Sequence, residues 1–134
     1  MKVVRSVKQI QFKANITGVG NYLPEKILTN DDIEKLVDTS DEWIQSRTGI
    51  RERRIARTGE ASAEMSTHAV HNLMENYKLN ADEIDAIIVA TITPDMMFPS
   101  TAALVQNNLN AQNAWGYDLS AACSGFLFAL QSGS

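Results

Sequence analysis

A short and almost wholly apolar run, residues 85–91, constrains the fold more than any other part of the chain. A run of this length and composition predicts a strand that is buried on both faces, as in a parallel sheet covered by helices. Before this run, residues 62–78 have apolar side chains at helical spacing, which predicts a helix. After it, residues 99–106 predict a second helix, whose start Ser100 can cap. This alternation of strands and helices is typical of a layered α/β fold with a mostly parallel sheet.

Local patterns predict further strands and helices on both sides of this run. Strand-like patterns occur at residues 12–20, 50–56 and 115–119. Residues 29–32 and 39–42 each match the capping box, in which a hydroxyl and an acidic side chain satisfy the first amides of a helix. Each of these two segments therefore predicts the start of a short helix. The sequence contains no internal repeat or linker, so we expect one continuous α/β unit.

The composition is that of an ordinary soluble globular protein. The chain has 134 residues, of which 44% are hydrophobic and 21% are charged, enough for one domain with a core. No apolar run approaches the ~20 residues of a membrane span, and residues 1–13 lack the apolar core of a secretory signal. With one cysteine and no signal, the chain is expected in a reducing cytoplasm and not in a membrane.

The charge of the chain is unevenly spread, although the formal net charge is only −4. Five arginines fall within eleven residues: Arg47, Arg51, Arg53, Arg54 and Arg57. Such a cluster suits phosphate groups or an acidic partner. The alternative is a solvated face that neighbouring glutamates neutralise. Nucleic acid is a poor fit, because the chain is acidic overall and no aromatic residues are interleaved with the arginines.

Cys123, the only cysteine, follows the predicted strand at residues 115–119 and precedes an apolar helix. A helix start favours a thiolate by roughly 0.3 to 1 kcal/mol, up to about 2 when partly buried. That is at most about one pKa unit, so a neighbouring base such as histidine is also expected. The alternative is a buried structural cysteine. Active groups gather at the carboxyl ends of parallel strands, where Cys123 and residues 93–99 both lie, and this placement favours a nucleophile.

Three other groups of residues are candidate sites. Trp43 and Arg47 are four residues apart on a predicted helix, so they suit a flat aromatic ligand with a phosphate, or form a surface cation–π pair. His68 and His71 have no further ligands at a familiar spacing, so we expect a polar helix face and no metal site. Residues 96–98 form an apolar tip that suits core packing, a partner interface or an acyl pocket.

Four motifs carry a resemblance to a known enzyme family. They are residues 18–24, 37–53, 98–100 and 121–126, of which the second is the most specific. From about residue 16 to residue 130, the chain resembles the amino-terminal part of β-ketoacyl-acyl carrier protein synthase III, the initiating condensing enzyme of bacterial fatty acid synthesis.

The resemblance implies a thiolase-like fold built from two similar α/β halves. Residues 12–134 would be the first half, incomplete, and residues 1–11 an N-terminal extension. In this family the histidine and asparagine that serve decarboxylation and condensation come from the second half, and neither His68 nor His71 matches them. We therefore expect a piece of a longer enzyme that is inactive alone. The alternative is a non-catalytic binding or structural module.

The resemblance also implies a role for each candidate residue. Cys123 would accept a short acyl group, such as acetyl, from acyl-CoA as a thioester. Trp43 would stack on the CoA adenine beside Thr39, and Arg47 would contact a CoA phosphate. Phe98 matches the residue that reaches across the homodimer interface of the family toward the acyl pocket of the partner.

The implied reaction is a decarboxylative condensation. Malonyl-acyl carrier protein would lose CO2, and its carbanion would attack the Cys123 thioester to give a 3-oxoacyl product. Acyl-CoA is a substrate here, so no cofactor and no metal is implied. Relatives that make polyketide starters or other 3-oxoacyl thioesters share the same motifs, so they are an alternative.

Overall fold

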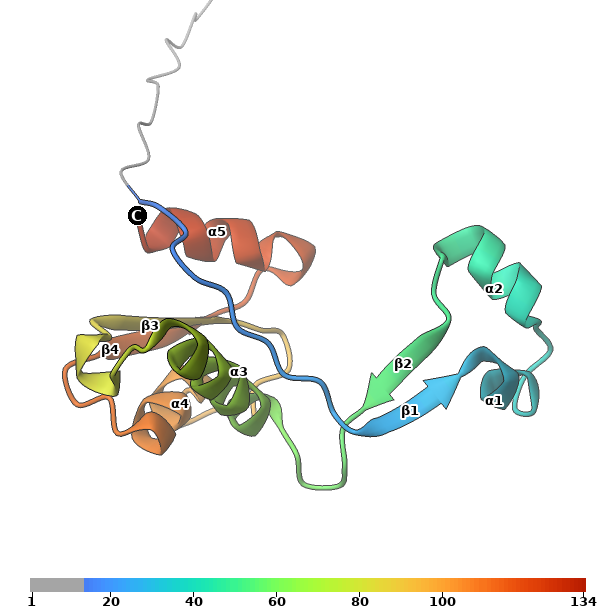
Figure 1. Cartoon of the computed structure of the whole chain (residues 1–134), viewed down its shortest axis with the longest axis horizontal. Helices are drawn as coiled ribbons and strands as arrows, with labels where there is room; N and C mark the ends of the chain where they lie inside the picture. The colour runs from blue at the N-terminus through green and yellow to red at the C-terminus, as the bar shows by residue number, and fades with distance from the viewer. Residues whose placement is uncertain (1–13) are drawn as a thin grey trace, which may run out of the picture.

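The computed structural model describes residues 14–134, so the expected extension at residues 1–11 lies outside the described part (Figure 1). In chain order the elements are β1 (Lys26–Thr29), α1 (Asn30–Glu34), α2 (Asp41–Thr48), β2 (Glu52–Ile55), α3 (Ser62–Tyr77), η1 (Ala81–Glu83), β3 (Ala86–Ala90), α4 (Thr101–Leu109), β4 (Trp115–Leu119), η2 (Ala122–Ser124) and α5 (Gly125–Ser132). Figure 1 shows that β1, α1, α2 and β2 form a projecting arm, and that the elements from α3 onward form a layered body.

The body is a three-layer α/β structure. Strands β3 and β4 pair in parallel, with Ala86 opposite Trp115 and Ala90 opposite Leu119. Helix α4 packs on one face of this pair with α3 beside it, and α5 packs on the other face (Figure 1). Val105 of α4 is almost fully buried in the core. The predicted parallel pair is therefore confirmed.

Strand β3 is less buried than its apolar sequence predicts. Ala86 and Ala90 at its two ends are exposed, and the three residues between them are half-buried. In the described residues the sheet has two strands, so one edge of β3 has no neighbouring strand. The prediction of a strand buried on both faces is therefore wrong for this chain as the structure describes it.

The arm is built on the antiparallel pair β1 and β2, in which Lys26 lies opposite Ile55. The first capping box is confirmed, because Thr29 and Asp32 bond reciprocally at the start of α1. The hydrogen bond from Thr29, together with that from Lys35, lowers the pKa of Asp32 to about 2. The second capping box, predicted at residues 39–42, is wrong by one residue. The residue that caps α2 is Ser40 and not Thr39, because the Ser40 hydroxyl accepts a hydrogen bond from the Trp43 amide.

The arm joins the body through two chain segments, residues 21–25 and 56–61. Tyr22 lies on the first and donates its hydroxyl hydrogen to Glu60 Oε1 on the second at 2.5 Å. This bond raises the pKa of Tyr22 above its usual value and lowers the pKa of Glu60. The Glu60 side chain is only 2% exposed, and it also accepts from the Arg57 amide. A buried carboxylate therefore ties the two segments together.

Residues 14–20 do not form the predicted strand but an extended coil along α3. A Cβ atom placed on Gly20 would lie 2.4 Å from the carbonyl oxygen of Ala69, so the coil touches the helix backbone. Strand β1 was not predicted, since its pairing with β2 is a tertiary contact that local pattern does not reveal. No helix in the described residues is long and apolar enough to span a membrane.

Candidate functional site

Cys123 stands in a tight turn between β4 and α5. The turn is the 3-10 segment Ala122–Ser124, and Ala122 adopts a left-handed conformation with φ of 45°. An alanine pays roughly 1–2 kcal/mol for this conformation, because its Cβ crowds the following carbonyl. Gly125 then brings the start of α5 close to the end of β3, where a Cβ would lie 3.3 Å from the Ala90 Cβ. A strained backbone thus fixes the place of Cys123.

The thiol of Cys123 is exposed and free, so the alternative of a buried structural cysteine is wrong. The backbone amide of Cys123 lies just before the first hydrogen-bonded amides of the helical turn. In that turn the Ser124 amide donates to the Ala121 carbonyl oxygen, and the Gly125 amide donates to the Ala122 carbonyl oxygen. No side chain caps the start of α5. The helix dipole at this end favours a negative charge such as a thiolate or an oxyanion.

The loop that carries Phe98 leaves the same edge of the sheet as Cys123. Strands β3 and β4 are parallel, and the Thr91 amide just after β3 donates to the carbonyl oxygen of Leu119 at 3.1 Å. The base of the loop is anchored to α3, where Asp95 accepts from the Ala63 amide at 2.9 Å. Phe98 at the tip is 88% exposed. The tip therefore projects from a fixed base, which excludes core packing for Phe98 among the described residues.

Helix α2 presents Trp43 and Arg47 together. The Arg47 Cζ atom lies 5.9 Å from the centroid of the Trp43 ring, so the cation–π pair forms. Trp43 is nonetheless 57% exposed, while Ile44 beside it is buried. Thr39, just before the helix, is half-buried, and its hydroxyl has no hydrogen-bond partner within residues 14–134. The face of α2 that carries Trp43 is open to a ligand.

The arginine cluster is only partly neutralised. Three members have polar partners: Arg53 bonds to Asn30, Arg54 to Glu52, and Arg57 to Glu60 and Glu64. Arg47 and Arg51 make no ion pair with any residue of the described range. Arg53 has only a neutral amide as its partner, so three arginines of the cluster carry no ion pair within residues 14–134, and of these Arg47 lies beside Trp43.

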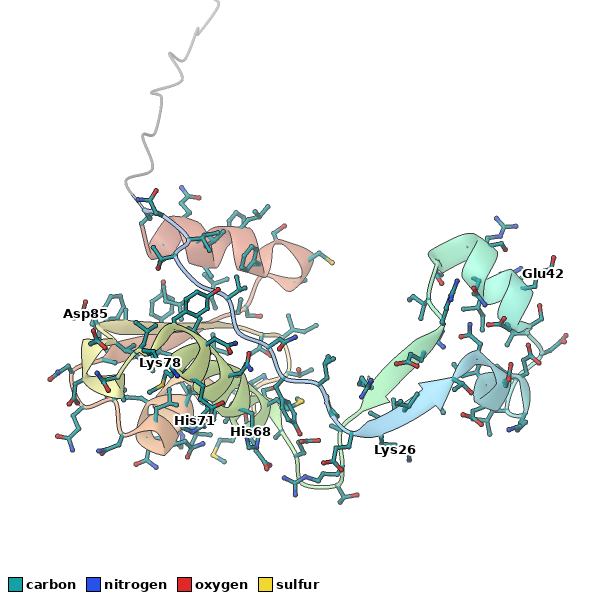
Figure 2. The ribbon with its side chains drawn as sticks, viewed as in Figure 1. Lys26, Glu42, His68, His71, Lys78 and Asp85 are labelled. Carbon is teal, nitrogen blue, oxygen red and sulfur yellow. The ribbon has the colours of Figure 1, made fainter. Side chains whose placement is uncertain are left out.

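Neither histidine takes part in these sites. His68 stacks on Tyr22 with ring centroids 4.8 Å apart and lies 3.8 Å from Glu64. Figure 2 shows His68 and His71 on α3, away from α5. Among residues 14–134, no three His, Cys, Asp or Glu side chains gather as a metal site would need. Neither histidine therefore lies beside α5, the helix that follows Cys123.

The structure thus brings some predicted residues together and leaves others apart. Cys123 and the Phe98 loop share one edge of the body, while Trp43, Arg47 and Thr39 lie on or beside α2 at the far end of the arm (Figure 1). Sequence reasoning missed the left-handed Ala122, because alanine carries no signal for that conformation. It also missed Asn30, a buried amide whose partners come from distant parts of the arm.

Solved structures share this fold. The chain superposes on 3-oxoacyl-[acyl-carrier-protein] synthase III from Aquifex aeolicus with a TM-score of 0.81 and 52% identity, over 87% of this chain and 37% of that chain. It also matches a priming β-ketosynthase of the R1128 polyketide biosynthetic pathway, with a TM-score of 0.80 and 39% identity, over 86% of this chain and 34% of that one. The fold is therefore the thiolase-like α/β class.

Sequence relatives agree with the structures. The chain is 57% identical to the β-ketoacyl-[acyl-carrier-protein] synthase III of Chlorobaculum tepidum over 123 residues, which cover 91% of this chain and 37% of that relative. No family model matches the chain. It spans less than two fifths of the length of this relative. The chain is homologous to the amino-terminal part of β-ketoacyl-[acyl-carrier-protein] synthase III.

Proposed function

We propose that this chain is the acyl-accepting and CoA-binding part of a condensing enzyme that starts fatty acid synthesis. The observation that carries the proposal is the exposed Cys123 on a strained turn at the start of α5. The homology to β-ketoacyl-[acyl-carrier-protein] synthase III supports it. The substrates are a short acyl-CoA, with acetyl-CoA the first candidate, and malonyl-acyl carrier protein.

In the first half-reaction, the Cys123 thiolate attacks the thioester carbonyl carbon of acyl-CoA. The carbonyl oxygen becomes an oxyanion, which the Cys123 amide at the helix start stabilises. The intermediate collapses, the carbon–sulfur bond to CoA breaks, and CoA leaves as a thiolate that takes up a proton. The acyl group remains on Cys123 as a thioester.

In the second half-reaction, malonyl-acyl carrier protein loses CO2, and the electron pair of the broken bond becomes a carbanion. The carbanion attacks the acyl carbon on Cys123, which expels the Cys123 thiolate and gives 3-oxoacyl-acyl carrier protein. In the family this step is served by a histidine and an asparagine, and neither His68 nor His71, which lie on α3 away from α5 (Figure 2), matches that histidine. We assign the histidine and the asparagine to a carboxyl-terminal part of a longer enzyme.

The proposed CoA site is on α2. Trp43 stacks on the adenine, Arg47 contacts a phosphate, and Thr39 lies beside the base. The exposed indole supports this assignment, as does the lack of an ion pair at Arg47 and Arg51 within residues 14–134. In the proposed homodimer, Phe98 reaches the acyl pocket of a second subunit, and its exposure on an anchored loop supports that role.

A chimera tests the proposed function. We join residues 1–134 to the remaining part of the Chlorobaculum tepidum relative and assay condensation of acetyl-CoA with malonyl-acyl carrier protein. We expect the chimera to condense these substrates and the 134-residue chain alone to be inactive. A folded chimera without activity would contradict the proposal, and condensation by the chain alone would contradict the need for a second part.

A Trp43→Ala substitution tests the CoA site. Stacking of a base on an aromatic side chain contributes ~1–3 kcal/mol, so we expect CoA to bind roughly 5- to 150-fold more weakly. Titration calorimetry of the chain with CoA measures the affinity, and circular dichroism checks the fold. Trp115→Phe, a change at the other tryptophan, is the matched control and should leave the affinity unchanged. Equal affinity in Trp43→Ala would refute the assignment.

The second candidate is a priming enzyme for polyketide synthesis. The 39% identity to the priming β-ketosynthase favours it. The two candidates use the same Cys123 chemistry and differ in the acyl primer and the acceptor. A comparison of the chimera with acetyl-CoA and with longer or branched acyl-CoA primers separates them.

A further inference from the structure

The arm contains one fully buried polar side chain, Asn30, at the start of α1. Asn30 is 1% exposed, and α2 contributes only Ile44 to the buried hydrophobic residues. A buried amide is costly unless its donors and its acceptor are all bonded. The interior of the arm is thus organised around an amide rather than around a cluster of large apolar side chains.

Every polar atom of the Asn30 side chain is bonded, and each partner comes from a different segment. The Nδ2 atom donates to Asp41 Oδ1 at 2.6 Å and to the Ile50 carbonyl oxygen at 2.8 Å. The Oδ1 atom accepts from Arg53. Asn30 therefore connects the first residue of α2, the chain that leaves α2, and strand β2.

Asp41 links Asn30 to the middle of helix α2. Its second carboxylate oxygen accepts from Gln45 Nε2, one turn further along the helix, at 2.6 Å. Among the elements of the described chain, α2 packs mainly against α1. The hydrogen bonds that reach α2 through Asp41 are therefore its principal restraint, together with the burial of Ile44.

We propose that Asn30 is a positioning residue for α2, which sets the direction in which Trp43 and Arg47 are presented. As a determinant of CoA affinity, this role rests on the proposed function. Asn30 is buried, so its side chain is not available to a ligand bound on the surface of α2. It holds both ends of α2. Its hydrogen bond to Asp41 restrains the first residue of the helix, and its hydrogen bond to the Ile50 carbonyl oxygen restrains the chain that follows the helix.

The test uses the 134-residue chain with Asn30→Ala and a control at another asparagine. Asn76→Ala removes an amide that bonds only to Asn72 on the exposed surface of α3. A reciprocal double variant, Asn30→Asp with Asp41→Asn, restores an amide–carboxylate pair with the partners exchanged. Three quantities are measured: amide hydrogen exchange of α2, the emission of Trp43 in a Trp115→Phe background, and CoA affinity.

We expect Asn30→Ala to speed exchange in α2 on the order of 10- to 100-fold, since a bond to a charged partner is lost in a buried site. Exchange in α3 and α4 and all properties of Asn76→Ala should stay unchanged. The emission of Trp43 should shift and CoA affinity should fall. The double variant should recover only part of the loss, because a carboxylate at position 30 accepts from position 41 and from Arg53 but cannot donate to the Ile50 carbonyl oxygen.

Unchanged α2 exchange and unchanged Trp43 emission in a folded Asn30→Ala chain would overturn the proposal. Should that variant fail to fold, Asp41→Asn is measured in the same way, and the same two outcomes decide. If the unaltered chain does not bind CoA, the proposed function fails. The exchange and emission measurements still decide the role of Asn30, because they need no ligand.

Discussion

Replacement of Cys123 by alanine is expected to abolish acylation of the chimera and to lower condensation by on the order of 10³-fold or more, since Cys123 is the only cysteine that this chain contributes. Incubation with acetyl-CoA followed by intact mass measurement should show one added acetyl group on the unaltered chimera. Peptide mapping should place that group on Cys123. The Cys123→Ala chimera should show no added mass.

The matched control for this experiment is Ser124→Ala. Ser124 is the next residue, and its side chain makes no capping bond to α5. This variant should be acylated like the unaltered chimera. Acylation that persists in Cys123→Ala, or an unaltered folded chimera that takes up no acetyl group, would show that Cys123 is not the acyl acceptor.

The second large effect is expected from Gly20→Ala, which should destabilise the body by about 1–3 kcal/mol. The added Cβ would lie 2.4 Å from the Ala69 carbonyl oxygen and 2.8 Å from the Leu73 amide nitrogen, so the coil must move off α3. Backbone atoms of a helix cannot turn aside as a side chain can. Urea unfolding, followed by the emission of Trp115 in a Trp43→Phe background, measures the loss.

Gly18→Ala provides the control for this prediction. At Gly18 the nearest atoms to an added Cβ belong to the side chains of Leu73 and Tyr77, at 3.0 and 3.2 Å. Side chains can adjust by a few tenths of an ångström, so this substitution should cost less. Equal stability of Gly20→Ala and the unaltered chain would show that the contact between coil and helix is not a packing constraint.

Much of the body could be predicted because its signals are local. The apolar run at residues 85–91 and the cap at Ser100 led to β3 and α4, and both are present. The arm was less predictable, since β1 has no strand pattern of its own and depends on its pairing with β2. Residues 14–20 resemble a strand but lie against α3, where glycines permit a close approach.

The candidate site shows the same division. Cys123, Trp43 and Arg47 could be selected from residue type and spacing. The structure shows that Cys123 is exposed and that Arg47 lies over the Trp43 ring, the surface pair that was the alternative to a ligand site. The left-handed Ala122 and the buried Asn30 could not be selected in this way. Their conformation and burial arise from contacts between segments that are distant in the sequence, and no local pattern encodes those contacts.

The two chain segments that join the arm to the body have a thermodynamic consequence. Most packing of helices and strands lies within the arm or within the body, and the bond between Tyr22 and Glu60 ties the segments at their junction. We therefore expect two cooperative folding units, of which the smaller can open while the larger stays closed. Each tryptophan, one in each unit, should then report a transition of its own, and a single melting temperature would not describe the chain.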